Sequence, residues 1–319
     1  MKNFVLHLTT FLILIGNSLH TEGQVKVGSF KKCGGERLTE LDYERLKECT
    51  LYFVVPNYLT EDREEFTKII KASWTYCDIK VIETHELEKY EYNDNSAFME
   101  IRIFTESLFD SPFSTFSYIT FEMNLVPIKG NLFGFKEYIY LGCFQLIPGK
   151  QMISQHYENR SVDLELKKII YEGPLDIINF KPGLVASYLK NIEFGLKERV
   201  SMCEDGSNIV KKTELRNLVE DTLYITENLI NEGDKFTEEE FIKTYPYPYK
   251  FITFDALEEM LLSKKQFYYY ISHSYISVCN SQTGEILYWT GYWKPQKILK
   301  VKKRNLSGLA KAIAEMSQK

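Results

Sequence analysis

The sequence predicts an α/β protein built from two tandem, duplicated β-α-β-α-β domains with mixed sheets, each closed by a helix. Three observations lead to this prediction. Short runs of aromatic and β-branched residues favour strands, and amphipathic stretches at helical spacing separate them. The second half repeats the elements of the first half in the same order. The 319 residues are enough for two domains of ordinary size, each with its own core.

The N-terminal residues 1–24 have the layout of a secretory signal peptide. Lys2 precedes a mostly apolar run over residues 4–16, and a polar stretch follows it. The run is shorter than the roughly 20 apolar residues that a membrane helix needs. An N-terminal core strand or helix is the alternative interpretation. We expect removal of residues 1–24, a periplasmic or secreted location, and no integral membrane segment after cleavage.

The first domain is expected over residues 46–205, behind an N-terminal segment at 25–45 that is either mobile or a sheet edge. It opens with the strand "TLYFVV". The helix "TEDREEFTKIIKASW" follows, with apolar residues at helical spacing behind Thr60 as a candidate N-cap. The runs "DIKVIETHEL" and "AFMEIRIF" then predict two more strands, with a helix start between them.

The rest of the first domain is predicted to be a long hairpin and a closing helix. The hairpin strands are "YITFEMNLVPI" and "EYIYLGCFQLIPG". The helix is "PGLVASYLKNIEFGLKERV", with Pro182 at a favourable first-turn position. The polar stretch 201–215 is predicted to be a linker, because Gly206 and Asn208 interrupt it.

The second domain, residues 206–319, begins with the strand "TLYITENLI". Thr237 and Glu240 then have capping-box spacing at the start of a helix. The strand "PYKFITF", the helix "DALEEML" and the strand "FYYYISHSYI" follow, and two strand-like runs surround a turn at Gly284. The closing helix is "NLSGLAKAIAEM", with Asn305 as its expected N-cap.

The spacing between equivalent elements is the evidence for duplication. Thr50 and Thr222 are 172 positions apart, and the later strand pairs are aligned at an offset of 170, including Ala97 with Phe267. The closing helices, however, are only 122 positions apart, from Leu184 to Leu306. The first domain is therefore expected to carry a 48-residue insertion that contains the long hairpin. Chance similarity between β-α-β segments is the alternative explanation.

Charge and motif content argue against several function classes. The formal net charge of −5 gives no broad positive field for nucleic-acid binding. The sequence has no phosphate-binding glycine motif, no H-E-x-x-H zinc motif, no EF-hand spacing and no G-x-S-x-G nucleophile elbow. No cofactor, metal ligand or catalytic residue is predicted. The cysteines at 49, 77, 143 and 279 lie in or beside apolar runs, which favours buried free thiols.

Four aromatic residues near the C-terminus are the candidate binding residues. They are Tyr288, Trp289, Tyr292 and Trp293. Such residues more often form the paired faces of a sheet, but exposed members would suit a protein or carbohydrate ligand.

Part of the chain resembles the α/β domain of curli-secretion-type lipoproteins and the N-terminal domain of the Tol–Pal periplasmic propeller protein. The resemblance lies in "TLYITENLI", "FITFDALEEML", "FYYYISHSYI" and "SVCNSQTGEILYW", and in the order of these elements. It covers most of residues 218–317 and, less clearly, 46–200. The chain departs from the lipoproteins in lacking a lipidation cysteine. The resemblance implies envelope assembly or protein interaction rather than catalysis.

The function expected from the sequence is therefore that of an exported, non-enzymatic protein-interaction or envelope-assembly module with a protein partner. Two alternatives stay open. One is a secreted hydrolase with a site between the two halves, for which Glu83, His85, Asp255 and His273 are the first residues to find together. The other is a carbohydrate-binding module that uses Tyr288, Trp289 and Trp293.

Overall fold

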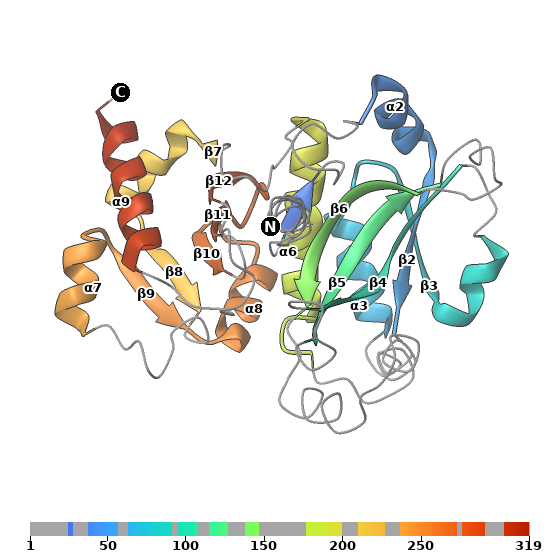
Figure 1. The fold of residues 1–319 in the computed structure, drawn as a ribbon, viewed down its shortest axis with the longest axis horizontal. Coiled ribbons are helices and arrows are strands. Elements are labelled where there is room, and N and C mark those ends of the chain that lie inside the picture. The colour runs from blue at the N-terminus through green and yellow to red at the C-terminus, as the bar shows by residue number, and fades with distance from the viewer. Residues whose placement is uncertain are drawn as a thin grey trace, which may run out of the picture.

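Helices and two six-stranded mixed sheets make up the computed structural model of the chain (Figure 1), which confirms the predicted α/β class. The structure describes residues 25–27, 38–56, 63–90, 95–107, 115–126, 138–146, 177–199, 210–226, 237–272, 276–290 and 303–318. The signal-peptide prediction for residues 1–24 lies outside these ranges.

The first sheet has the strand order β1-β6-β5-β4-β2-β3. Its strands are β1 (Val25–Val27), β2 (Thr50–Val55), β3 (Asp78–Glu83), β4 (Ser96–Ser107), β5 (Thr115–Leu125) and β6 (Ile139–Leu146). Strand β2 runs parallel to β3 and β4, and the other neighbours are antiparallel. The predicted hairpin is β5 with β6, and β1 makes part of the N-terminal segment a sheet edge.

The first half also contains α2 (Glu40–Glu48), α3 (Arg63–Ser73), the 3-10 helix η2 (Thr84–Lys89) and the closing helix α6 (Pro182–Lys197). Helix α3 buries Phe66 and Ile70, as its helical spacing predicts. Helix α6 begins at Pro182, as predicted. Helices α3 and α6 pack side by side over one face of the first sheet.

The second sheet has the order β7-β12-β11-β10-β8-β9. Its strands are β7 (Val210–Lys211), β8 (Leu223–Thr226), β9 (Tyr249–Ile252), β10 (Tyr268–Ser272), β11 (Ile276–Asn280) and β12 (Ile286–Thr290). The helices are η4 (Thr213–Val219), α7 (Glu238–Thr244), α8 (Phe254–Leu262) and α9 (Lys303–Ser317). The predicted capping box is present at α7, where Thr237 and Glu240 bond each other's backbone N–H groups.

The two sheets match strand for strand in order and in direction. They also share an irregularity. The pairing of β5 with β6 skips Leu141, and the pairing of β11 with β12 skips Leu287. Tracing the register from strand to strand brings these two leucines to equivalent positions, and both are buried. A bulge is a specific feature of backbone geometry, so its recurrence is a second similarity beyond strand order.

The structure corrects the predicted alignment of β4 with β10. Where β2 pairs with β4, Leu51 is opposite Ala97. Where β8 pairs with β10, the equivalent Leu223 is opposite Tyr268. Ala97 is therefore equivalent to Tyr268 and not to Phe267. A one-residue slip moves every side chain of a strand to the other face of the sheet. In β10 both faces are apolar, so the sequence pattern did not reveal which tyrosines face which core.

Two other local predictions were wrong. The predicted linker at 201–215 contains β7 and the start of η4, because a two-residue edge strand needs no apolar run to form. Asn305 does not cap the closing helix. Helix α9 begins two residues earlier, at Lys303, and Asn305 is buried within its first turn.

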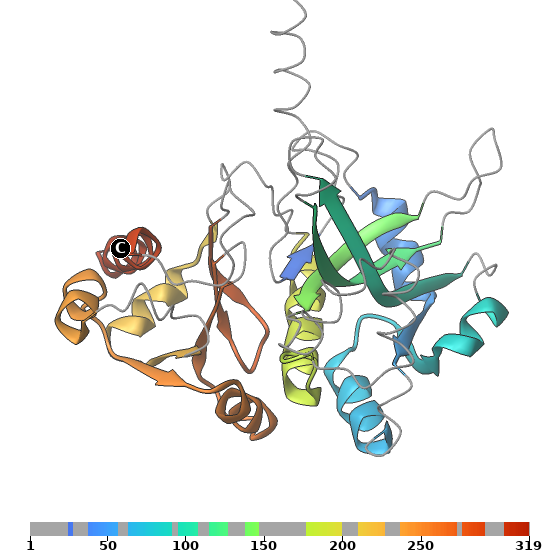
Figure 2. The same ribbon diagram turned by 60° about the horizontal axis from the view of Figure 1, so that its bottom comes forward.

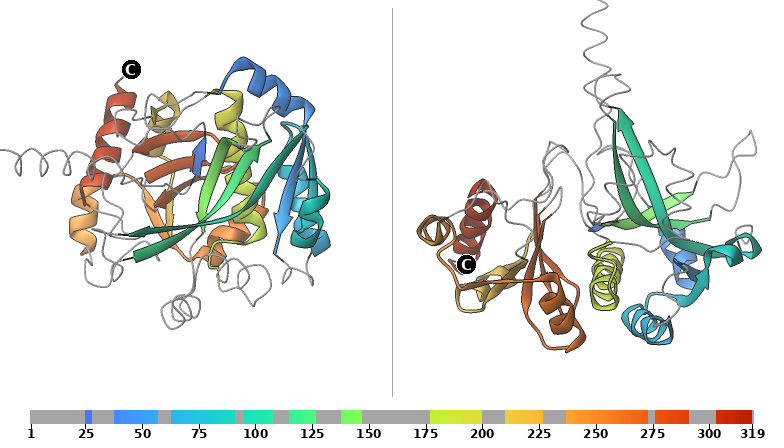
Figure 3. Two further views of the ribbon diagram at one scale, coloured as in Figure 1. Left: turned by 45° about the vertical axis from the view of Figure 1, so that its right-hand side comes forward. Right: turned by 90° about the horizontal axis from the view of Figure 1, so that it is seen from below.

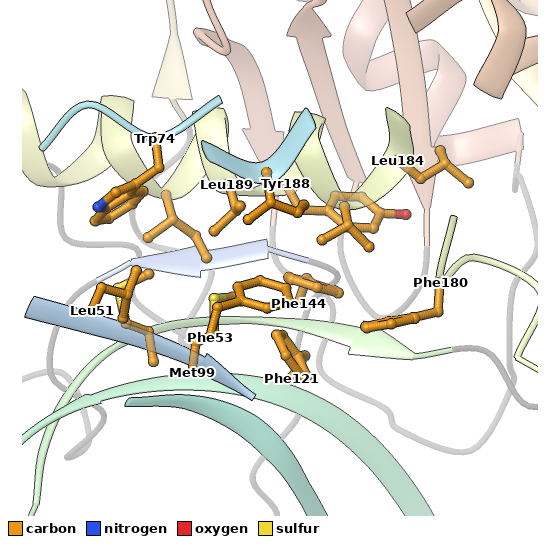
Figure 4. Packing of buried hydrophobic residues seen from close by; sticks show 14 of the residues in the cluster. Leu51, Phe53, Trp74, Met99, Phe121, Phe144, Phe180, Leu184, Tyr188 and Leu189 are labelled. Carbon is orange, nitrogen blue, oxygen red and sulfur yellow. The ribbon is translucent and has the colours of Figure 1, made fainter. Parts of the chain in front are cut away.

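Helix α6 lies between the two sheets (Figure 2; Figure 3, right). One side of it packs with α3 on the first sheet, where Tyr188 and Phe144 have ring centroids 4.6 Å apart. Figure 4 shows this core from close by. The other side of α6 packs on the second half, and one hydrophobic cluster contains residues of both halves. A second cluster lies on the far face of the second sheet, under η4, α7 and α9.

Candidate functional site

The four predicted aromatic binding residues do not form one exposed platform. Tyr288 and Trp289 are 3% and 1% exposed and belong to different hydrophobic clusters, because neighbouring strand residues point to opposite faces. Burial also raises the pKa of the Tyr288 phenol to about 12. Tyr292 and Trp293 lie outside the described residues. The two residues that can be placed therefore form the paired faces of a sheet, and neither offers an exposed surface to a ligand.

The four residues proposed for a hydrolytic site have separate environments where they are described. Glu83 forms an ion pair with Arg63, and its Oε2 atom lies 3.1 Å from Nδ1 of the exposed His85. The exposed carboxylate of Asp255 instead pairs with Lys181. His273 lies outside the described residues. These contacts associate Glu83 with His85 and do not bring Asp255 to them.

The N-terminus of α6 is held by a buried carboxylate from the second half. The Glu258 side chain on α8 accepts hydrogen bonds from the backbone N–H groups of Gly183 and Leu184, at 2.6 and 2.8 Å. These two groups have no partner within the helix, so Glu258 caps α6 from outside. A Cβ atom on Gly183 would lie 2.9 Å from Oε2 of Glu258, so glycine permits the close approach. Burial raises the pKa of the Glu258 carboxyl despite these donors.

A second polar group of contacts joins the middle of α6 to the second sheet. Asn191 donates from Nδ2 to the backbone oxygen of Gly284 at 2.6 Å, and its Oδ1 accepts from the Tyr269 hydroxyl at 3.4 Å. That hydroxyl also shares a hydrogen bond with Ser187. Burial raises the pKa of the Tyr269 phenol. These polar groups are buried and satisfy one another, so they fix the packing of the two halves rather than offer a site to a ligand.

The face of the first sheet opposite α6 carries a polar cluster. Glu100 on β4 and Glu122 on β5 are register partners, and each is only 6% exposed. Arg102 contacts the Glu100 carboxylate at 2.5 Å, and the Thr120 hydroxyl donates to Glu122 at 3.2 Å. Cross-strand partners have Cβ atoms about 5 Å apart, so the two carboxylates are neighbours. Such a pair could serve in acid–base chemistry if a substrate reached it.

The second sheet ends in an aromatic cluster at its outermost described strand, β9. We call this the aromatic edge. It consists of the rings of Phe241, Tyr245, Tyr247, Tyr249 and Phe251, together with Ile242, which follows Phe241 on α7. The Phe241 ring centroid lies 4.2 Å from that of Tyr249 and 5.1 Å from that of Phe251. The Tyr245 ring packs edge-on against Tyr247 at 5.5 Å. These rings join α7 to the edge strand.

The aromatic edge is partly exposed. Phe241 and Tyr245 are buried, and Tyr247, Tyr249 and Phe251 are partly exposed. Ile242 on α7 is 48% exposed. None of the binding residues predicted from the sequence belongs to this region. The stretch "YPYPYKF" at 245–251 places an aromatic residue at every second position, and that alternation is the signal that could have found it.

The described residues hold no group of three or more histidine, cysteine, aspartate or glutamate side chains placed to bind a metal ion. Within the same ranges, no helix has both the length and the apolar character needed to cross a membrane. Comparison with known proteins does not identify the site: no protein-family profile, curated protein or solved structure matches this chain.

Proposed function

We propose that this chain is an exported, non-enzymatic binding protein that contacts a protein partner in the periplasm or outside the cell through its aromatic edge. The proposal combines the signal-peptide layout of residues 1–24 with the exposure of the aromatic edge. It also agrees with the resemblance to envelope-assembly domains. The single observation that favours it most is the gathering of partly exposed aromatic side chains at the last described strand of a sheet, against α7, on which Ile242 is 48% exposed.

We infer that the two halves are copies of one module. The shared strand order, the shared strand directions and the leucine bulge at equivalent positions support this inference. A duplicated module can retain one fold while its copies take different roles. In the first half one of the two helices that cover the sheet, α6, is buried on both sides. The second half has the aromatic edge, and this asymmetry supports a binding role for the second copy.

The composition of the aromatic edge suits a protein interface. Tyrosine and phenylalanine are enriched at interfaces, since they bury a large apolar area for little loss of side-chain freedom. Charged side chains border the apolar centre on α7, where the exposed Lys243 pairs with Glu239 at 2.7 Å. An apolar centre with a charged rim is the usual anatomy of a specific contact.

The test compares two matched substitutions in the chain from residue 25 to 319. Ile242→Glu places a carboxylate on the aromatic edge, and Leu262→Glu does the same at the end of α8, where the leucine is 42% exposed. Each protein, with a photo-activated cross-linker in place of the exposed Lys243 on α7, is presented to envelope and culture-medium extracts of its source. We expect one partner to cross-link to the wild type and to Leu262→Glu. Ile242→Glu should bind it at least about tenfold more weakly, or about 1.4 kcal/mol.

Two results would contradict this proposal. If both variants capture the same partner equally well, the aromatic edge is not the binding surface. If the chain hydrolyses members of a substrate panel and Glu122→Gln abolishes that activity, the protein is an enzyme that uses the carboxylate pair on the first sheet. Circular dichroism of each variant shows whether the substitution has left the fold intact.

A further inference from the structure

Two cysteines stand side by side at the start of neighbouring strands. Cys49 comes directly before β2 and Cys77 directly before β3, and these strands are paired in parallel with Thr50 opposite Asp78. Neighbouring strands lie about 4.8 Å apart. This spacing falls within the range of about 4.4 to 6.8 Å between Cα atoms that a disulfide requires. The backbone therefore already holds the two residues at bonding separation.

The two thiols interact, and each shifts the pKa of the other. Both thiols face the core side of the first sheet, where Cys49 is buried and Cys77 is partly exposed. The Cys49 thiol has a single proton, and the backbone oxygen of Leu46, 3.2 Å from its sulfur, is the alternative acceptor for it. No rearrangement of the strands is needed to bring the sulfur atoms together.

Cys77 is the more reactive of the two thiols. Its sulfur accepts a hydrogen bond from Nε1 of Trp74 at 3.4 Å, and the Leu51 backbone N–H also contributes. Together with the Cys49 thiol, these donors stabilise a thiolate and lower the pKa of Cys77. The pKa of Cys49 is raised, because its proton is held in the contact with Cys77 and because the group is buried.

We propose that Cys49 and Cys77 form a disulfide bond by exchange with a low-molecular-weight disulfide, with Cys77 attacking first and Cys49 completing the bond. The Cys77 thiolate attacks one sulfur of the small disulfide, forms a mixed disulfide and releases one small thiolate. The Cys49 sulfur then loses its proton, attacks the Cys77 sulfur and displaces the second small thiolate. The two protein thiols are oxidised by two electrons, and one small disulfide is reduced to two thiols.

The environment explains why this order is expected. Cys77 is the sulfur that an external reagent can reach, whereas Cys49 is covered. Cys49 lies against Cys77, so the mixed disulfide is resolved within the molecule. An oxidising compartment of the kind that the N-terminal sequence predicts would keep the bond formed.

The first test uses the full chain from residue 25, equilibrated with oxidised glutathione, blocked with an alkylating agent under native conditions and digested. We expect a linked pair of peptides that contain Cys49 and Cys77, with both residues protected from alkylation. Cys143 and Cys279, which are buried apart from this pair, should become alkylated only after unfolding. The proposal is overturned if Cys49 and Cys77 stay reduced at equilibrium, or if Cys77 is found linked to any other cysteine.

Two variants test the order of attack. Cys49→Ala leaves the first step intact and should accumulate glutathione on Cys77. Cys77→Ala removes the attacking sulfur, so Cys49 should carry no glutathione under the same conditions. Glutathione on Cys49 in the Cys77→Ala protein would refute the assigned order. The wild-type peptide map tests the bond itself even if one variant fails to fold.

Discussion

Replacing Gly284 with alanine is expected to weaken the packing of the second half on α6. Gly284 has a φ of +74°, in the left-handed region, and lies in the turn between β11 and β12. A Cβ atom there would lie 2.6 to 2.7 Å from atoms of Lys190, including its backbone carbonyl carbon and oxygen. Helix α6 is packed on both sides, so it cannot move away from the added carbon atom. The turn must therefore move, which strains the hydrogen bond from Asn191 to Gly284.

The size of the effect follows from two contributions. A left-handed conformation costs a residue with a Cβ atom about 1 to 2 kcal/mol. Forcing an extra carbon into a packed interior costs about 1 to 3 kcal/mol more. We therefore expect Gly284→Ala to reduce the free energy of unfolding by about 2 to 5 kcal/mol. Urea unfolding followed by circular dichroism measures this change as a lower midpoint with an unchanged slope.

Gly308→Ala is the matched control. Gly308 is inside α9, where alanine is favoured over glycine by about 0.5 to 1 kcal/mol. Its Cβ atom would meet one atom, the Tyr288 hydroxyl oxygen, at 3.1 Å. These effects oppose each other, so the net change should stay within about 1 kcal/mol. A Gly284→Ala protein as stable as the control would refute the claim that this turn is seated against the backbone of α6.

Three further predictions concern the core, the interface and the disulfide. Phe121→Ala should cost about 3 to 5 kcal/mol in urea unfolding, since its ring centroid lies 4.8 to 5.4 Å from those of three other phenylalanines. A loss below about 1 kcal/mol would contradict the packing shown in Figure 4. Glu258 has a raised native pKa, so its contribution to stability declines as the pH rises from its unfolded pKa of about 4.3 through the native value. Glu258→Gln should flatten that decline in unfolding midpoints measured across this range, and an unchanged slope would contradict the assignment. Reducing the bond from Cys49 to Cys77, which closes a loop of 28 positions, should lower the free energy of unfolding by about 3.5 kcal/mol. Equal midpoints with and without a reductant would argue against its stabilising role.

Local signals in the sequence predicted most of the elements correctly. The capping box at Thr237, the proline at the start of α6 and the apolar spacing of α3 each depend on contacts within a few residues. Such signals identify an element wherever it packs. The order of the strands from β2 to β6 and from β8 to β12, and the hairpin of β5 with β6, followed from them, whereas α2 and η4 were not predicted. Of the shortest edge strands, β7 was missed and β1 was predicted only as one of two alternatives, because two or three residues carry no periodicity.

The sequence by itself determined the α/β class, the order of the main strands and the likeness of the two halves, because hydrophobic period and capping residues are local. Only the tertiary structure decided which faces meet. The second sheet is apolar on both faces, so its sequence could not show that Trp289 faces α6 while Tyr288 faces the other core. Nor could it show that Cys49 and Cys77 adjoin, or that the aromatic edge gathers residues of α7 and β9. These contacts depend on strand register, which the chain fixes only when the whole sheet has formed.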